Sequence, residues 1–319
     1  MNGRGQLLRA SLIVAALAVL AGSAGSARAG GTPIGFVALP AQGTLAVIEL
    51  PNGGRLARIR VPGEPAAVAA SVNGRRVLVA SPNAGTVTEI DGVHHRVLRI
   101  FRALAHPVAV ALDYEPPVGI VTPRYGFVLE RGRIASRLAV GARPDQIAVD
   151  GTTLWVAHAG SGTLTRIDVS APAAPRMLAS LHLAGGASVA LSADPELDSV
   201  FVSVRRSGLI ARYVDGGQRA RRVYMARIPG GPLAGIAVAA PHLLIVAEEH
   251  GVLDVMREQT GRRLARLRGA LDTRALDAYG GWLVAIRPRG LNLVGVPDGS
   301  LRTSVAFASR IGGFAWSVL

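Results

Sequence analysis

Val110-Ala111-Leu112-Asp113 and Ile147-Ala148-Val149-Asp150 are two copies of a short apolar motif that recurs along most of the chain. The other copies begin at Val68, Val189, Ile236, Leu276 and Phe314. Successive copies are therefore 42, 37, 42, 47, 40 and 38 residues apart. A period of about 40 residues built from short strands is typical of the blades of a β-propeller. The repeat predicts an all-β, ring-shaped fold.

Each repeat divides into four short strands joined by turns. In the second repeat we expect strands at residues 66–71, 76–80, 86–91 and 97–101. Asn73-Gly74 separates the first two, and this dipeptide is a strong hairpin signal because both residues tolerate positive φ. The fourth repeat divides in the same way, at residues 146–150, 154–158, 163–168 and 176–183. Four-stranded antiparallel blades follow from this spacing.

Seven segments have the character of a second strand, being β-branched and almost continuously apolar. They lie at residues 37–38, 77–80, 120–122, 154–157, 200–203, 244–247 and 283–286. Such segments fit strands that are covered on both faces by neighbouring blades. The fourth strands carry arginines, for example at residues 56–61 and 262–268. Charge on an outer edge strand prevents pairing with other chains.

The two ends of the repeated region complement each other. Residues 34–39 read as a second strand with no first strand before them, and residues 312–319 read as a first strand with nothing after them. We therefore expect one blade to be built from both termini, which closes the ring. The prediction is one domain over residues 30–319, a seven-bladed β-propeller of four-stranded blades.

Residues 1–29 have the pattern of a secretory signal peptide. Arg4 and Arg9 precede a short apolar core, and Ala27-Arg28-Ala29 reads as a cleavage site. An uncleaved membrane anchor is the alternative, but the apolar core is short for a span of about 20 residues. No second apolar stretch of spanning length follows. We expect a secreted or cell-envelope protein with no transmembrane span after cleavage.

Composition excludes several kinds of chemistry. The chain has no cysteine, so it has no disulfides, thiolate metal sites or cysteine nucleophiles. All 35 basic residues are arginine, and without lysine no side-chain amine can form a Schiff base. The net charge is +14, with the arginines scattered through every repeat rather than gathered into a nucleic-acid groove. Either codon bias in a GC-rich genome or a surface for anionic partners accounts for this charge.

One face of a propeller is formed by the loops leading into the innermost strands and the loops joining second to third strands. We call it the funnel face, because such loops converge on the axis and concave polar sites are where ligands usually bind. The ligand-binding candidates in its loops are Arg124, Arg143, His158, Arg205, His250 and Arg287. Arginine pairs bidentately with carboxylate or phosphate, which favours an anionic ligand or an acidic protein patch. The alternative is that loops of any basic protein carry such residues.

Two further groups have chemistry-bearing residue types. Glu248-Glu249-His250 carries metal-ligand types, although consecutive residues on a turn rarely converge on one ion. Asp113 and Asp150 end innermost strands, where they either line a channel as a carboxylate pair or begin turns. We assign no catalytic residue, metal ligand or cofactor from these patterns.

Two repeats resemble the YVTN family of bacterial and archaeal propeller repeats. The matching stretches run over residues 73–80 with 85–91, and over residues 153–157 with 161–168. No repeat carries the literal Y-V-T-N tetrad. The resemblance implies a secreted or surface propeller with a binding role rather than an enzyme. We therefore expect a monomeric binding or scaffold module with no specific nucleic-acid partner. A lactonase- or lyase-like propeller hydrolase with a metal in the central channel is the alternative.

Overall fold

A computed structural model describes residues 32–71, 73–102, 104–112, 118–141, 143–158, 161–183, 189–194, 198–217, 219–230, 232–239, 242–249, 251–268, 273–279, 282–296 and 301–318. The signal peptide expected at residues 1–29 lies outside these ranges, as do Asp113 and His250. Among the described residues, no helix is long and apolar enough to cross a membrane.

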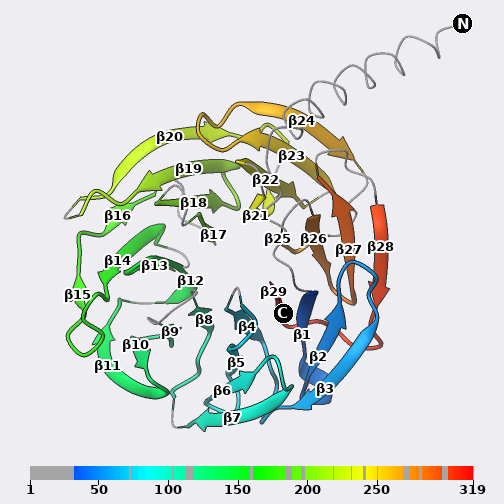
Figure 1. Ribbon diagram of the computed structural model, residues 1–319. Helices are drawn as coiled ribbons and strands as arrows, with labels where there is room; N and C mark the ends of the chain where they lie inside the picture. The colour runs from blue at the N-terminus through cyan, green and yellow to red at the C-terminus, as the bar shows by residue number, and fades with distance from the viewer. Residues whose placement is uncertain are drawn as a thin grey trace, which may run out of the picture.

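The described strands form seven antiparallel sheets arranged in a ring, which confirms the predicted seven-bladed β-propeller (Figure 1). We number the blades 1 to 7 in chain order. The innermost strands are β29 (Phe314–Val318), β4 (Ala67–Ala70), β8 (Ala109–Leu112), β12 (Pro144–Asp150), β17 (Val189–Asp194), β21 (Leu233–Ala239) and β25 (Ala275–Tyr279). The second strands are β1 (Pro33–Leu39), β5 (Val77–Ser81), β9 (Val118–Val121), β13 (Thr153–His158), β18 (Ser199–Val204), β22 (Leu243–Glu248) and β26 (Trp282–Arg287).

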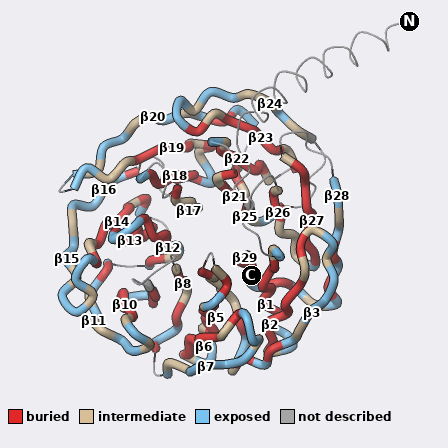
Figure 2. The backbone as a smooth tube through the Cα atoms, viewed as in Figure 1, coloured by how far each residue is buried: buried red, intermediate tan, exposed pale blue. Residues whose placement is uncertain are grey.

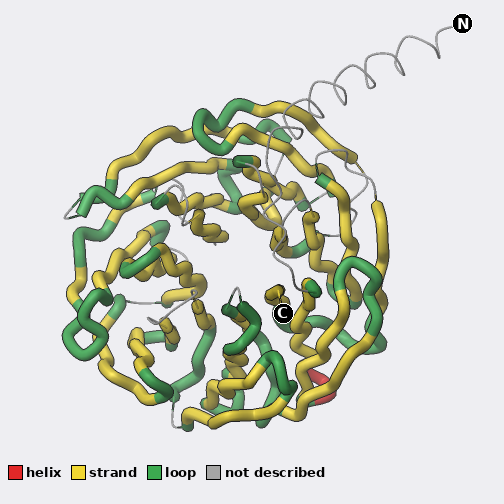
Figure 3. Tube along the Cα trace, in the orientation of Figure 1, coloured by secondary structure: helices red, strands yellow, loops and turns green. Residues whose placement is uncertain are grey.

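The outer half of each blade is built in the same order. The third strands are β2 (Thr44–Glu49), β6 (Thr86–Asp91), β10 (Tyr125–Glu130), β14 (Thr163–Asp168), β19 (Leu209–Val214), β23 (Val252–Arg257) and β27 (Gly290–Gly295). The outer strands are β3 (Arg55–Arg60), β7 (Arg96–Phe101), β11 (Arg133–Ala139), β15 (Arg176–Met177) with β16 (Leu181–His182), β20 (Arg221–Arg227), β24 (Arg263–Arg268) and β28 (Leu301–Ala306). The one short helix among the described residues is the 3-10 turn η1 (Pro40–Gln42) in blade 1 (Figure 3).

The hydrophobic core lies between the blades rather than at the axis. Seven clusters of buried side chains are described, one at each seam between neighbouring sheets. The cluster between blades 7 and 1, for example, packs Leu291 and Leu293 against Val37 and Phe314. Second and third strands are therefore buried almost throughout, while the outer strands are largely exposed (Figure 2). This burial explains the continuous apolar character of the second strands.

Blade 1 is closed by the two ends of the described chain, as predicted. Strand β29 pairs with β1 in an antiparallel register that sets Phe314 opposite Val37 and Ser317 opposite Ile34. The backbone N–H of Ala38 also donates to the carbonyl of Gly313 at 2.9 Å. The C-terminal strand β29 therefore supplies the innermost strand of blade 1 and completes the ring.

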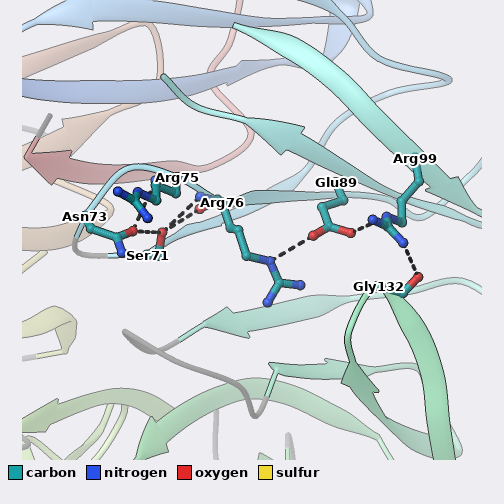
Figure 4. Close-up of polar contacts among 7 residues, drawn as sticks. All are labelled: Ser71, Asn73, Arg75, Arg76, Glu89, Arg99 and Gly132. Atoms are coloured by element: carbon teal, nitrogen blue, oxygen red, sulfur yellow. Dashed lines mark hydrogen bonds and ion pairs between the residues drawn. The ribbon is translucent and has the colours of Figure 1, made fainter. Parts of the chain in front are cut away.

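Charged side chains connect blades as well. Glu89 of β6 is buried and accepts from Arg76 Nε and Arg99 Nε, each at 2.8 Å (Figure 4). Arg99 then reaches across the seam, and its Nη1 donates to the carbonyl of Gly132 in blade 3 at 2.6 Å (Figure 4). Arginines of the outer strands are thus not all free surface charges, because some of them hold neighbouring blades together.

One outer strand differs from expectation. Residues 176–183 were predicted to form a single strand, but the structure has two short pieces, β15 and β16. Between them, the N–H of Leu178 donates to the carbonyl of Arg166 at 2.9 Å, and Ser180 Oγ lies 3.3 Å from Thr165 Oγ1. The local side-chain bond interrupts the ladder, a competition that serine and threonine commonly create.

Candidate functional site

Of the arginine candidates named from the sequence, Arg124 and Arg143 are the two that are exposed and form no ion pair with a described carboxylate. They come from neighbouring blades. Tyr125 pairs with Ala139 across β10 and β11, so the turn carrying Arg124 lies beside the loop that ends at Arg143. A Cβ built on Gly126 would stand 2.7 Å from Val140 Cγ1, which confirms how closely turn and loop approach. The two residues therefore lie in one part of the rim.

The loop before β12 has an uncommon backbone. Arg143 has φ of 54° and precedes Pro144, and His106 has φ of 56° and precedes Pro107 at the equivalent position of blade 3. Positive φ costs free energy for residues with a side chain and is concentrated at functional sites. Both side chains are exposed. The repeated conformation presents a cationic or titratable side chain on the same face of two adjacent blades.

His158 has a different position from the one expected. It was predicted in a loop of the funnel face, but it is the last residue of β13 and only 3% of its surface is exposed. Its Nε2 lies 2.9 Å from Thr165 Oγ1, and a Cβ on Gly141 would come within 3.2 Å of its ring. The imidazole therefore fills space beneath the loop of Arg143. It supports the loop and is covered from solvent.

Arg205 and Arg287 lie on the funnel face but are engaged within the protein. Arg205, in the turn after β18, forms an ion pair with Glu249 of the next blade. Arg287 ends β26, and its Nη1 donates to Asn292 Oδ1 at 3.2 Å. The charge of Arg205 is therefore partly compensated by Glu249, and the Arg287 side chain is turned towards its own blade. The sixth candidate, His250, lies outside the described residues.

The described acidic residues of the run Glu248-Glu249-His250 do not converge. Glu248 is 1% exposed and accepts from Arg266 Nη2 at 2.5 Å, whereas Glu249 turns to Arg205. Burial raises the pKa of Glu248, the neighbouring Asp254 carboxylate raises it further, and Arg266 opposes both. These contacts give Glu248 a structural role between β22 and β24.

One channel-side group was not singled out from the sequence. Asp277 lies on the innermost strand β25 and accepts a hydrogen bond from Trp316 Nε1 of the neighbouring innermost strand at 3.2 Å. Burial raises the pKa of Asp277 to about 7, against hydrogen bonds from Ala278 and Trp316 that lower it. The aspartate at this position of the recurring apolar motif was the sequence feature that could have indicated this group. Asp150, which ends β12, is buried, and its expected partner Asp113 lies outside the described residues.

The fold has known counterparts. No protein-family profile matches the chain, and no curated protein matches it. A functionally unknown protein from Desulfotomaculum acetoxidans superposes with a TM-score of 0.76 at 14% identity, over 89% of this chain and 99% of that one. Apo AztD from Citrobacter koseri superposes with a TM-score of 0.67 at 12% identity, over 90% of this chain and 98% of that one.

A third similar structure is the Cps50 (Swd1) β-propeller domain of Myceliophteria thermophila. It superposes with a TM-score of 0.61 at 13% identity, covering 82% of this chain and 90% of that one. Identities this low establish a shared propeller fold alone, since propellers carry unrelated functions. The fold suits a binding or scaffold module, and the site must be argued from its own residues.

Proposed function

We propose that the protein is an extracytoplasmic binding module whose funnel face receives an anionic ligand or an acidic protein patch. The observation that carries this proposal is the pair Arg124 and Arg143, exposed on adjacent blades with no described carboxylate in ion-pair distance. Other arginines of the chain, such as Arg76 and Arg266, are paired with buried carboxylates. An unpaired guanidinium is available to a ligand carboxylate or phosphate.

The contrast with the other described arginine candidates locates the binding part of this face. Arg205 and Arg287 are held by Glu249 and Asn292, so these two candidates offer less free positive charge than Arg124 and Arg143. Blades 3 and 4 add His106, exposed at the position equivalent to Arg143. We therefore place the anion contact on the loops of blades 3 and 4.

A double substitution tests the proposal with octaglutamate as the probe. Each exposed arginine–carboxylate contact contributes up to about 1 kcal/mol, so R124A/R143A should weaken octaglutamate binding about 30-fold. The matched control is R60A/R133A, which removes the same charge from exposed positions of the outer strands β3 and β11. Fluorescence polarisation of labelled octaglutamate measures both. Equal weakening in the two variants would show that net charge alone attracts the probe.

Secretion and repeat type are further parts of the same proposal. Export rests on the pattern of residues 1–29, and expression of the full chain followed by sequencing of the mature N-terminus should give a start at Gly30. A start at Met1 in the membrane fraction would support the anchor instead. We also propose that the repeats are of the YVTN type and that the protein is a monomer, which light scattering on a sizing column would measure.

A further inference from the structure

Three potential metal-ligand side chains converge on the face opposite the funnel face. They are Asp194, His242 and Glu258, and one ligand atom from each lies within 4.8 Å of the other two. Asp194 ends the innermost strand β17 of blade 5, His242 lies in the turn before β22 of blade 6, and Glu258 follows β23. The group therefore lies at the seam between blades 5 and 6.

Both carboxylates of this group are buried. Asp194 is 6% exposed and Glu258 is fully buried, while the His242 side chain is 46% exposed. Two carboxylates whose oxygen atoms lie within 4.8 Å of each other in a buried position repel each other. A divalent cation between them removes this repulsion, and His242 opens one side of the position to solvent.

The backbone holds these side chains in place. His242 has φ of 55°, a conformation in which histidine, asparagine and aspartate are enriched. Its carbonyl accepts from the N–H of Glu258 at 3.1 Å, which fixes the two ligands of blade 6 relative to each other. His242 Nδ1 already lies 3.5 Å from Glu258 Oε2. Ligands at tetrahedral zinc are about 3.3 Å apart, given bonds of about 2.0–2.2 Å, so this pair needs only a small movement.

A neighbouring tyrosine fits a supporting role. The Tyr224 hydroxyl oxygen is buried and has no hydrogen-bond partner in the part of the chain that the structure describes. Burial raises the pKa of Tyr224, Arg212 lowers it, and the charge of Glu258 raises it again, so the phenol lies within electrostatic reach of that carboxylate. Outer hydrogen bonds to ligating carboxylates orient metal ligands, and the Tyr224 hydroxyl is a donor available for such a bond in this region.

We propose that Asp194, His242 and Glu258 form a binding site for a divalent metal ion of the zinc type. One imidazole with two carboxylates suits zinc, whereas calcium takes six to eight oxygen ligands. Three protein ligands leave a fourth position for water or for a ligand supplied by a partner. This site is separate from the funnel face, so its test does not depend on the outcome of the anion-binding proposal.

Titration of chelator-treated protein with zinc chloride, followed by calorimetry, tests the site. We expect one zinc ion per chain, with equimolar calcium chloride failing to compete. H242N keeps a residue that tolerates the same backbone conformation, and E258Q keeps the shape of the buried side chain. Each should weaken zinc binding at least 10-fold, and zinc should raise the melting temperature of the wild type but not of these variants.

The matched control is H94N. His94 also has a carboxylate neighbour, Asp91, at 2.8 Å, but that pair is exposed and has no third ligand within reach among the described residues. H94N should bind zinc like the wild type. Absence of stoichiometric zinc binding in the wild type would overturn the proposal, and so would retention of that binding in H242N. Loss of folding in E258Q would leave H242N, at an exposed position, to decide the result.

Discussion

Removal of the Asp215 charge should destabilise the ring at the seam between blades 4 and 5. Arg166 of β14 is fully buried, and its Nη2 donates to the Asp215 carboxylate and to the carbonyl of Gly217, the latter at 2.6 Å. Its Nε and Nη1 are buried without a hydrogen-bond partner among the described residues. Asp215 is therefore the carboxylate that compensates this buried guanidinium.

The size of the effect follows from what D215N leaves behind. Removing one partner of a buried ion pair costs about 3–5 kcal/mol, because the other charge stays buried. The Asp215 side chain is 21% exposed, so we expect the lower end, about 3 kcal/mol. An unfolding entropy of about 2.1 cal/mol/K per residue over about 290 residues converts this to a melting temperature about 5 °C lower.

The reverse substitution should cost much less. R166M removes the buried charge and keeps an unbranched side chain that can pack against Trp155, whose ring centre lies 5.2 Å from the guanidinium carbon. The remaining Asp215 can be solvated and still accepts from Thr153 Oγ1 at 2.7 Å. R166M should therefore destabilise by about 1 kcal/mol or less, and R166M/D215N should recover most of the loss seen in D215N.

Thermal unfolding followed by circular dichroism measures all three variants. D168N is the control, since Asp168 is the partly exposed last residue of β14 in the same blade and its carboxylate accepts from the N–H of Ser170. It should change the melting temperature by about 1 °C at most. A D215N protein as stable as D168N would refute the reasoning, because it would mean that the buried guanidinium needs no carboxylate.

Three further outcomes are expected. Deleting residues 312–319 removes β29, and loss of the buried Phe314 side chain alone costs about 3 kcal/mol. The truncated protein should therefore melt well below the wild type. An unchanged melting temperature would contradict closure of the ring by β29. Because folding raises the pKa of Asp277 to about 7, the fold favours the protonated form, so stability should fall as the pH rises from about 4 to about 7. D277N should be the more stable protein at pH 8 and lose this dependence, which urea unfolding at several pH values measures. G92A should lower the free energy of unfolding by about 1–3 kcal/mol, because a Cβ at this position overlaps the backbone carbonyl of Gly74. A urea unfolding curve equal to that of the wild type would disprove the contact.

The repeating blades could be derived from the sequence because the signals are local. Thr86–Asp91 forms β6 with the bounds predicted, since turn residues on both sides and a continuous apolar run fix the strand. Pairing of the chain ends followed from counting strand types, and the register of β29 on β1 confirms it. The outer strand of blade 4 was divided by a Ser180–Thr165 contact that no periodicity reveals.

The candidate site also has features that the sequence predicted and features that only the structure showed. The sequence by itself determined which loops share a face, so Arg124, Arg143 and Arg205 were placed correctly on one rim. Only the tertiary structure decided that Arg205 is neutralised by Glu249, because that ion pair crosses between blades. It also brought Asp194 to His242 and Glu258, which are separated by whole strands and turns in the chain. Sequence periodicity reports which side of a strand is covered, whereas contacts across a seam depend on how two blades pack, and that packing has no local signal.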